Sequence, residues 1–67
     1  MRRDLTLSQF EALTKYADDV VGMGCWEVET TDYWYEGEFL ATKEDTRLYK
    51  SESTGEYVWE TKYYTID

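Results

Sequence analysis

The first third of the chain has apolar residues at helical spacing. They recur three or four residues apart and so fall on one stripe of an amphipathic helix. The stripe consists of Leu7, Phe10, Leu13, Ala17 and Val20 or Val21.

Signals for the ends of this helix flank the stripe. Thr6 with Gln9 forms a capping box, and Ser8 with Glu11 forms a second one that offers an alternative start. Gly22 and Gly24 follow the last apolar position, where a glycine commonly caps a helix C-terminus. We therefore expect one N-terminal helix over about residues 6–21.

After Gly24 the pattern changes to a period of two. Cys25–Glu29 and Tyr33–Ala41 alternate between apolar and polar positions, and Arg47–Glu52 and Glu56–Thr65 are rich in Tyr, Trp, Val and Thr. This composition is typical of β-strands. The chain therefore predicts an antiparallel meander of three to four strands over about residues 25–65, with turns at Thr31-Asp32, at Lys43-Glu44-Asp45 and at Ser53-Thr54-Gly55.

These turns determine which residues share a side of the predicted sheet. A turn at Thr31-Asp32 places Val28 opposite Tyr35, and a turn at Ser53-Thr54-Gly55 places Tyr49 opposite Trp59. The side expected to receive the helix then carries Trp26, Val28, Tyr35, Phe39, Ala41, Tyr49, Tyr57 and Trp59.

Size and composition favour one α+β domain that spans residues 1–67. At 67 residues the chain is near the lower limit for independent folding, so its core must come from large side chains. Seven Tyr, three Trp and two Phe are available for that core. Cys25 is the single cysteine, which favours a cytoplasmic, reducing setting and a packing role for the thiol.

The charge is strongly negative. Fifteen acidic residues against seven basic ones give a net charge of −8. Such a charge opposes direct binding to nucleic acid or to an anionic membrane, and it favours a positively charged partner. We expect a monomer rather than an oligomer.

The side of the predicted sheet that faces away from the helix is acidic. The predicted register places Glu27 opposite Glu36, and like charges directly opposite each other destabilise an antiparallel pair. Such a pair suggests a binding surface, although a simple solvated face is the alternative. The candidate partner-binding residues are Glu27, Glu29, Asp32, Trp34, Glu36, Glu38 and Glu60, with Asp18 and Asp19 as an extension.

Histidine and the motifs of common catalytic and metal sites are missing. The chain has no His, which is the usual base near neutral pH and the commonest metal ligand. Neither a phosphate-binding glycine loop nor a calcium-binding acidic loop is present. We therefore expect no catalytic residues, no metal, no cofactor and no enzymatic activity.

In size, charge and the spaced acids Glu27, Glu29, Asp32, Glu36 and Glu38, the chain resembles the small acidic inhibitors that phages encode against host defence, namely anti-CRISPR proteins and anti-restriction DNA mimics. The resemblance implies an inhibitor in the host cytoplasm that occupies a basic nucleic-acid channel in an effector complex.

Two hypotheses for function follow. In the first, the acidic face docks on a basic protein surface and blocks nucleic-acid binding there. In the second, Trp34 and its apolar neighbours recruit a protein without competing with nucleic acid.

Overall fold

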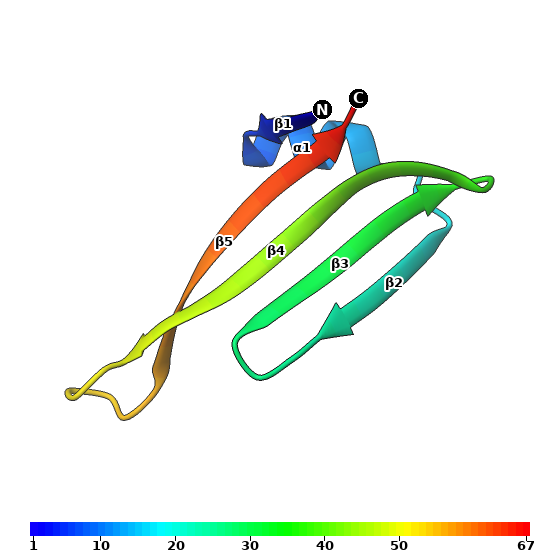
Figure 1. The fold of residues 1–67 in the computed structure, drawn as a ribbon. Helices are drawn as coiled ribbons and strands as arrows, with labels where there is room; N and C mark the ends of the chain where they lie inside the picture. Colours follow the sequence, from blue (N-terminus) through cyan, green and yellow to red (C-terminus); the bar gives the residue numbers. More distant parts are fainter.

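The computed structural model describes all 67 residues as one helix against a five-stranded antiparallel sheet with the strand order β1-β5-β4-β3-β2. The predicted α+β class is confirmed, with five strands in place of three or four. The molecule is elongated, with extents of 43, 22 and 21 Å, and the β4–β5 hairpin projects beyond the rest of the sheet (Figure 1). The elements are β1 (Arg2–Leu5), α1 (Leu7–Thr14), β2 (Asp19–Gly24), β3 (Val28–Tyr35), β4 (Glu38–Lys50) and β5 (Tyr57–Ile66).

Helix α1 begins at the first of the two predicted capping boxes. The Gln9 N–H donates to Thr6 Oγ1 at 3.2 Å, and the Thr6 N–H donates to Gln9 Oε1 at 2.9 Å. Two backbone donors that the first turn leaves without partners are thus satisfied by side chains. A strand that the sequence pattern did not reveal, β1, precedes the helix and pairs with β5.

The helix ends at Thr14, well before the predicted end at residue 21. The segment that follows contains Val20 and Val21, whose β-branched side chains favour extended backbone, and glycines, which weaken a helix. It forms the edge strand β2 and pairs with β3. Gly22 and Gly24 lie inside this strand, so their predicted role as a helix cap was wrong.

The predicted turns at Thr31-Asp32 and Lys43-Glu44-Asp45 were also wrong, because both segments lie inside long strands. The chain instead reverses at Glu36-Gly37, where the φ angles are 47° and 81°. Positive φ at both central residues is the requirement of a two-residue type I′ hairpin, and glycine meets it without strain. The predicted turn at Ser53-Thr54-Gly55 lies within a longer loop over residues 51–56, and Gly55 adopts the predicted positive φ, at 74°. The predicted pairing was wrong, because Tyr49 lies opposite Val58 and not opposite Trp59.

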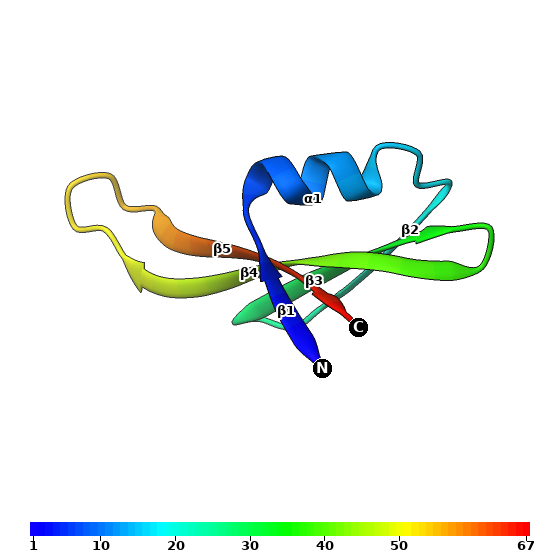
Figure 2. The same ribbon diagram turned by 90° about the horizontal axis from the view of Figure 1, so that it is seen from above.

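Phe10 is the centre of a very small core. Its ring lies 5.1 Å from the Tyr33 ring and 4.6 Å from the Tyr63 ring, and only 6% of the residue is exposed. Ala41 is fully buried. Only four residues of the chain are buried, because α1 covers only part of one face of the sheet and leaves the other face open (Figure 2).

The contacts of Phe10 and the strand register assign residues to two faces. Tyr33 and Tyr63 contact Phe10, so they point to the side of the sheet that carries α1. Residues paired with either of them point to the same side, and so does every second residue along each strand, because side chains alternate between the two faces. We call this side the helix face and the other the open face. The helix face carries Val20, Gly22, Gly24, Glu29, Thr31, Tyr33, Ala41, Lys43, Asp45, Arg47, Trp59, Thr61 and Tyr63. The open face carries Asp19, Val21, Met23, Val28, Thr30, Asp32, Trp34, Phe39, Thr42, Glu44, Glu60, Lys62 and Tyr64.

The predicted helix-facing side is therefore partly wrong. Ala41 and Trp59 do lie on the helix face, but Val28 and Phe39 lie on the open face. Trp59 is 42% exposed, because α1 does not reach that end of β5. The displaced turn and the irregularities after Tyr33 and after Arg47 change the pairing, and a shift of one residue moves a side chain to the other face.

Candidate functional site

Nearly all of the net charge belongs to one part of the molecule. Residues 16–42 contain seven carboxylates and no Lys or Arg, whereas the rest of the chain carries seven basic and eight acidic residues. This segment forms β2, β3 and the first part of β4, which is the half of the sheet that ends at the β2 edge (Figure 1). We call residues 18–38 the acidic hairpin. Its acids are Asp18, Asp19, Glu27, Glu29, Asp32, Glu36 and Glu38.

The acidic hairpin brings together all but one of the acids predicted for the partner-binding site, but not on one face. Glu29 lies on the helix face, and Asp19 and Asp32 lie on the open face. All these acids are exposed except Asp32, which is half-buried. Glu60, the remaining predicted acid, lies on β5 with its carboxylate 3.9 Å from Lys62.

Glu27 and Glu36 do not face each other, as the predicted register had required. Glu27 precedes β3 and Glu36 follows it, so the length of that strand separates them. The like-charge pair that the structure contains is Glu29 opposite Asp45, on β3 and β4.

Glu29 leans away from this pair toward the edge of the sheet. A Cβ atom added to Gly24 would lie 3.0 Å from Glu29 Cγ, so the Glu29 side chain occupies the space that glycine leaves open. Repulsion by Asp45 on one side and the bare backbone of Gly24 on the other both favour this orientation. The result is an exposed carboxylate beside the β2 edge.

Two of the hairpin acids are held by hydrogen bonds. The Asp18 carboxylate accepts the Glu36 N–H at 3.2 and 3.4 Å, which ties the start of β2 to the β3–β4 turn. Asp32 accepts a hydrogen bond of 2.7 Å from the buried Thr42 hydroxyl. The donors are a backbone N–H and a hydroxyl, so neither hydrogen bond brings a cation to these carboxylates.

The ion pairs of the molecule all lie outside the acidic hairpin. They join Arg2 to Asp4, Arg3 to Asp67 and Lys62 to Glu60. The Arg3 guanidinium donates to the Asp67 carboxylate at 2.8 Å, which lowers the pKa of Asp67 and raises the pKa of Arg3. Compensation by nearby cations is therefore common near the chain ends and lacking in the hairpin.

Trp34, the predicted aromatic anchor, is half-buried on the open face. Its ring packs edge-to-face on Phe39 with the centroids 5.4 Å apart. A more exposed aromatic group lies at the other end of β3. There the Arg47 guanidinium lies 4.4 Å from the Trp26 ring centroid and 4.5 Å from that of Tyr57, and Trp26 is 72% exposed. The predicted register separates the members of this group, so the sequence pattern does not reveal it.

Cys25 is exposed in the loop between β2 and β3, so its predicted role as a packing residue was wrong. Hydrogen bonds from the backbone of Glu27 and then of Val28 lower the pKa of its thiol, and they outweigh the nearby Glu27 charge. The thiolate is the reactive form of cysteine, so a lowered pKa favours reaction at this exposed thiol.

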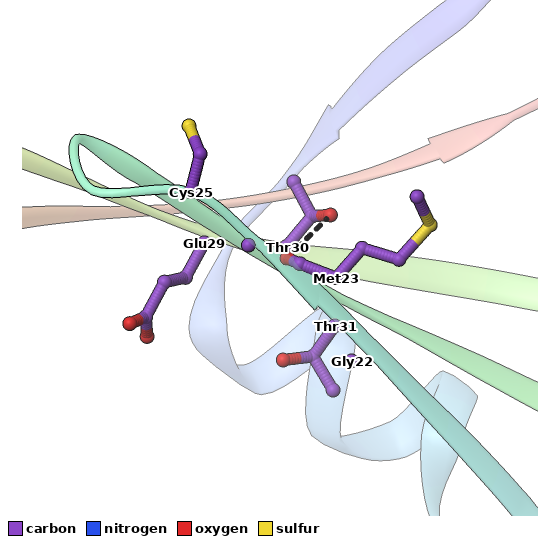
Figure 3. Close-up of a pocket in the computed structure, with 7 residues that line it drawn as sticks. Gly22, Met23, Cys25, Glu29, Thr30 and Thr31 are labelled. Atoms are coloured by element: carbon purple, nitrogen blue, oxygen red, sulfur yellow. Dashed lines mark hydrogen bonds between the residues drawn. The ribbon is translucent and has the colours of Figure 1, made fainter.

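The β2–β3 end beside Cys25 is hollowed. A shallow depression of about 300 Å³ is lined by residues 22–25 of the edge strand and its loop and by residues 29–31 of β3. Glu29 and Thr31 project to one side of the hairpin, and Cys25 projects to the other (Figure 3). The Thr30 hydroxyl donates to the Met23 carbonyl at 3.3 Å and fixes the two strands at this point.

No three His, Cys, Asp or Glu side chains lie close enough together to hold a metal ion. The single helix is too short and too polar to cross a membrane.

Comparisons of the chain with protein-family models, with curated proteins and with solved structures found no match.

Proposed function

We propose that the protein acts by binding rather than by catalysis, and that the acidic hairpin docks on a basic surface of another protein. The observation that carries the proposal is the presence of seven carboxylates and no Lys or Arg in residues 16–42, with none of these acids in an ion pair. Lys or Arg side chains of a partner would supply the missing cations. Complementary charge of this kind speeds association and selects the partner.

The pair of Glu29 and Asp45 supports the same proposal. Like charges directly opposite each other destabilise an antiparallel sheet. A partner cation beside Glu29 would relieve this repulsion in the complex. Sites that break a local folding rule in this way are commonly binding sites.

The spacing of the charges favours a partner surface that normally holds nucleic acid. The eight residues of β3 extend roughly 26 Å at about 3.3 Å per residue. Seven carboxylates over that length, counted over both faces of the hairpin, average about one charge per 4 Å, close to the ~3.4 Å spacing of phosphates along one DNA strand. We therefore propose that the protein competes with a nucleic-acid strand and inhibits its binding.

Competition provides the test. The immobilised protein would capture a partner from a nuclease-treated cell extract, and a labelled single-stranded oligonucleotide would be bound to the purified partner. Titration with the free protein should displace the oligonucleotide. A partner that holds the protein and the oligonucleotide at the same time would overturn the proposed inhibition.

A second function has one observation in its favour. Trp26, stacked on Arg47 and highly exposed, is a suitable aromatic anchor for a protein adaptor. This hypothesis retains the adaptor of the sequence analysis but moves its centre from Trp34. An adaptor of this kind should bind with little salt dependence, should be weakened by Trp26→Ala, and should leave oligonucleotide binding unaffected.

A further inference from the structure

Strand β2 forms one edge of the sheet and offers unpaired backbone groups. Its six residues are all exposed. The Cys25 N–H donates to the Val28 carbonyl at 2.9 Å, so Cys25 and every second residue before it direct their backbone groups inward to β3. The alternate residues Val20, Gly22 and Gly24 direct theirs outward, to the side where no strand follows.

The two edges of the sheet differ in how they are protected. Strand β1 at one edge has four residues, of which Arg2, Arg3 and Asp4 are charged, with a net positive charge. Short length and positive charge both discourage the addition of a further strand. Strand β2 is longer, and it has no Pro and no Lys; its one charged residue, Asp19, lies at its start. It therefore lacks the usual protection.

Glycine makes the β2 edge unusually accessible. Nothing lies within 4 Å of the position that a Cβ of Gly22 would occupy. The bare backbone of Gly22 borders the depression beside β3, whereas Gly24 is covered by the Glu29 side chain (Figure 3). Glycine inside a strand often marks a place where another backbone approaches closely.

The charge beside this edge identifies its occupant. Glu29 leans over Gly24 toward the edge, so a long side chain of an added strand can cross the glycine and reach the carboxylate. An added strand would lie about 10 Å from β3, two strand spacings away. Lys and Arg have the length and the charge for this contact.

We infer that β2 accepts an extended segment of a basic partner protein as a sixth strand, with Lys or Arg on the helix-face side above Gly24. The inference rests on the proposed function and specifies how the acidic hairpin binds. A second copy of this chain fits less well, because β2 pairing between two copies would bring together two hairpins that each carry seven carboxylates and no cation.

Amide hydrogen exchange tests this directly. The probe is a short synthetic peptide in which Lys and Val alternate, added to the intact protein. The amides of Val20, Gly22 and Gly24 should become protected, whereas those of Val21 and Met23, already bonded to β3, should change little. The same peptide with a methyl group on the backbone nitrogen of each Lys keeps its charge but cannot donate to β2, and it should give no protection. Protection of the three amides at high protein concentration without peptide would instead identify a second copy as the occupant and overturn the inference.

A pair of variants separates strand addition from charge. Gly22→Pro removes one outward N–H at an edge position where proline is tolerated. The affinity for the peptide should fall about tenfold, which corresponds to the loss of one hydrogen bond. Gly22→Ala keeps that N–H, and its added Cβ meets nothing within 4 Å, so this variant should bind the peptide like the parent. The hydrogen-exchange result decides the question if Gly22→Pro fails to fold. If Glu29→Gln lowers the affinity for the peptide and a folded Gly22→Pro variant does not, strand addition at the β2 edge is refuted while the proposed function stands. If neither change matters, both fail.

Discussion

Replacing Phe10 by Ala should detach helix α1 from the sheet. Phe10 is the one large side chain of the helix that is buried, and it contacts Tyr33 and Tyr63 on two different strands. A helix of eight residues is too short to persist alone in water. Its stability therefore depends on this contact.

The expected cost is large compared with the stability of the whole domain. Truncation of a buried Phe to Ala usually costs about 3–5 kcal/mol. At roughly 0.05–0.15 kcal/mol per residue, a domain of this length has a free energy of unfolding of about 3–10 kcal/mol. The melting temperature should fall by more than about 12 °C, at roughly 4–8 °C per kcal/mol for a domain of this size.

Trp59→Ala is the matched control. The sequence pattern had placed Trp59 in the core with Phe10, but the residue is 42% exposed and lies beyond the reach of α1. We expect its replacement to cost roughly 1 kcal/mol, the typical value for a point substitution. Both variants would be measured by thermal and urea denaturation. Equal losses for the two variants, or a loss below about 1 kcal/mol for Phe10→Ala, would refute the assigned core.

Three further predictions concern single residues. Gly37→Ala should lower the free energy of unfolding by about 1 kcal/mol in chemical denaturation, because a φ of 81° strains a residue with a side chain. Gly22→Ala, whose added Cβ meets nothing within 4 Å, should cost less. Equal costs for the two variants would argue against the turn at Glu36-Gly37. Asp32→Ala should lower the free energy of unfolding by roughly 1–3 kcal/mol, because it leaves the buried Thr42 hydroxyl without its partner, and Asp32→Asn should recover part of the loss. An unchanged melting curve for Asp32→Ala would rule out this hydrogen bond. The pKa of the Cys25 thiol is lowered, so more thiolate is present below the ordinary pKa of cysteine. The rate of its reaction with iodoacetamide should therefore rise with a midpoint at lower pH than for a cysteine in an unstructured peptide. An identical or higher midpoint would contradict the backbone hydrogen bonds to the thiolate.

Local signals predicted the start of the helix but not its end. The capping box of Thr6 and Gln9 acts within a few residues, and the structure contains it. The end was misplaced because Val20 and Val21 fit both the helical stripe and a strand. Pairing with β3, which follows after the loop of residues 25–27, decides for the strand, and the spacing of the apolar residues alone does not report this pairing.

The sheet shows how one displaced turn affects an assignment of faces. Thr31-Asp32 was predicted as the turn, although Glu36-Gly37, with its glycine between two alternating segments, carries the stronger hairpin signal. This error moved Phe39 to the wrong side and created the apparent pair of Glu27 and Glu36. The irregularities within β4 could not be predicted from alternation, because each inserts a residue that breaks the period.

The candidate acids were identified by type but not by arrangement. The predicted acids other than Glu60 lie on β2, on β3, in the segments that flank them and at the start of β4, whereas Glu60 lies apart on β5. A simpler signal was present in the sequence and was overlooked, namely the lack of any Lys or Arg between residues 16 and 42. The orientation of Glu29 over Gly24 depends on strand pairing and becomes visible only in the structure.

The salt dependence of partner binding tests the central claim most directly. Two double variants remove the same amount of charge, E29Q/E38Q from the acidic hairpin and E52Q/E56Q from the exposed β4–β5 turn. Affinity for the captured partner would be measured over a series of salt concentrations. We predict weaker binding and a shallower salt dependence for E29Q/E38Q, with a melting temperature equal to or above that of the parent because the repulsion between Glu29 and Asp45 is removed. The E52Q/E56Q variant should bind like the parent. Equal effects of the two variants, or no effect of E29Q/E38Q at low salt, would contradict the assignment of binding to the acidic hairpin.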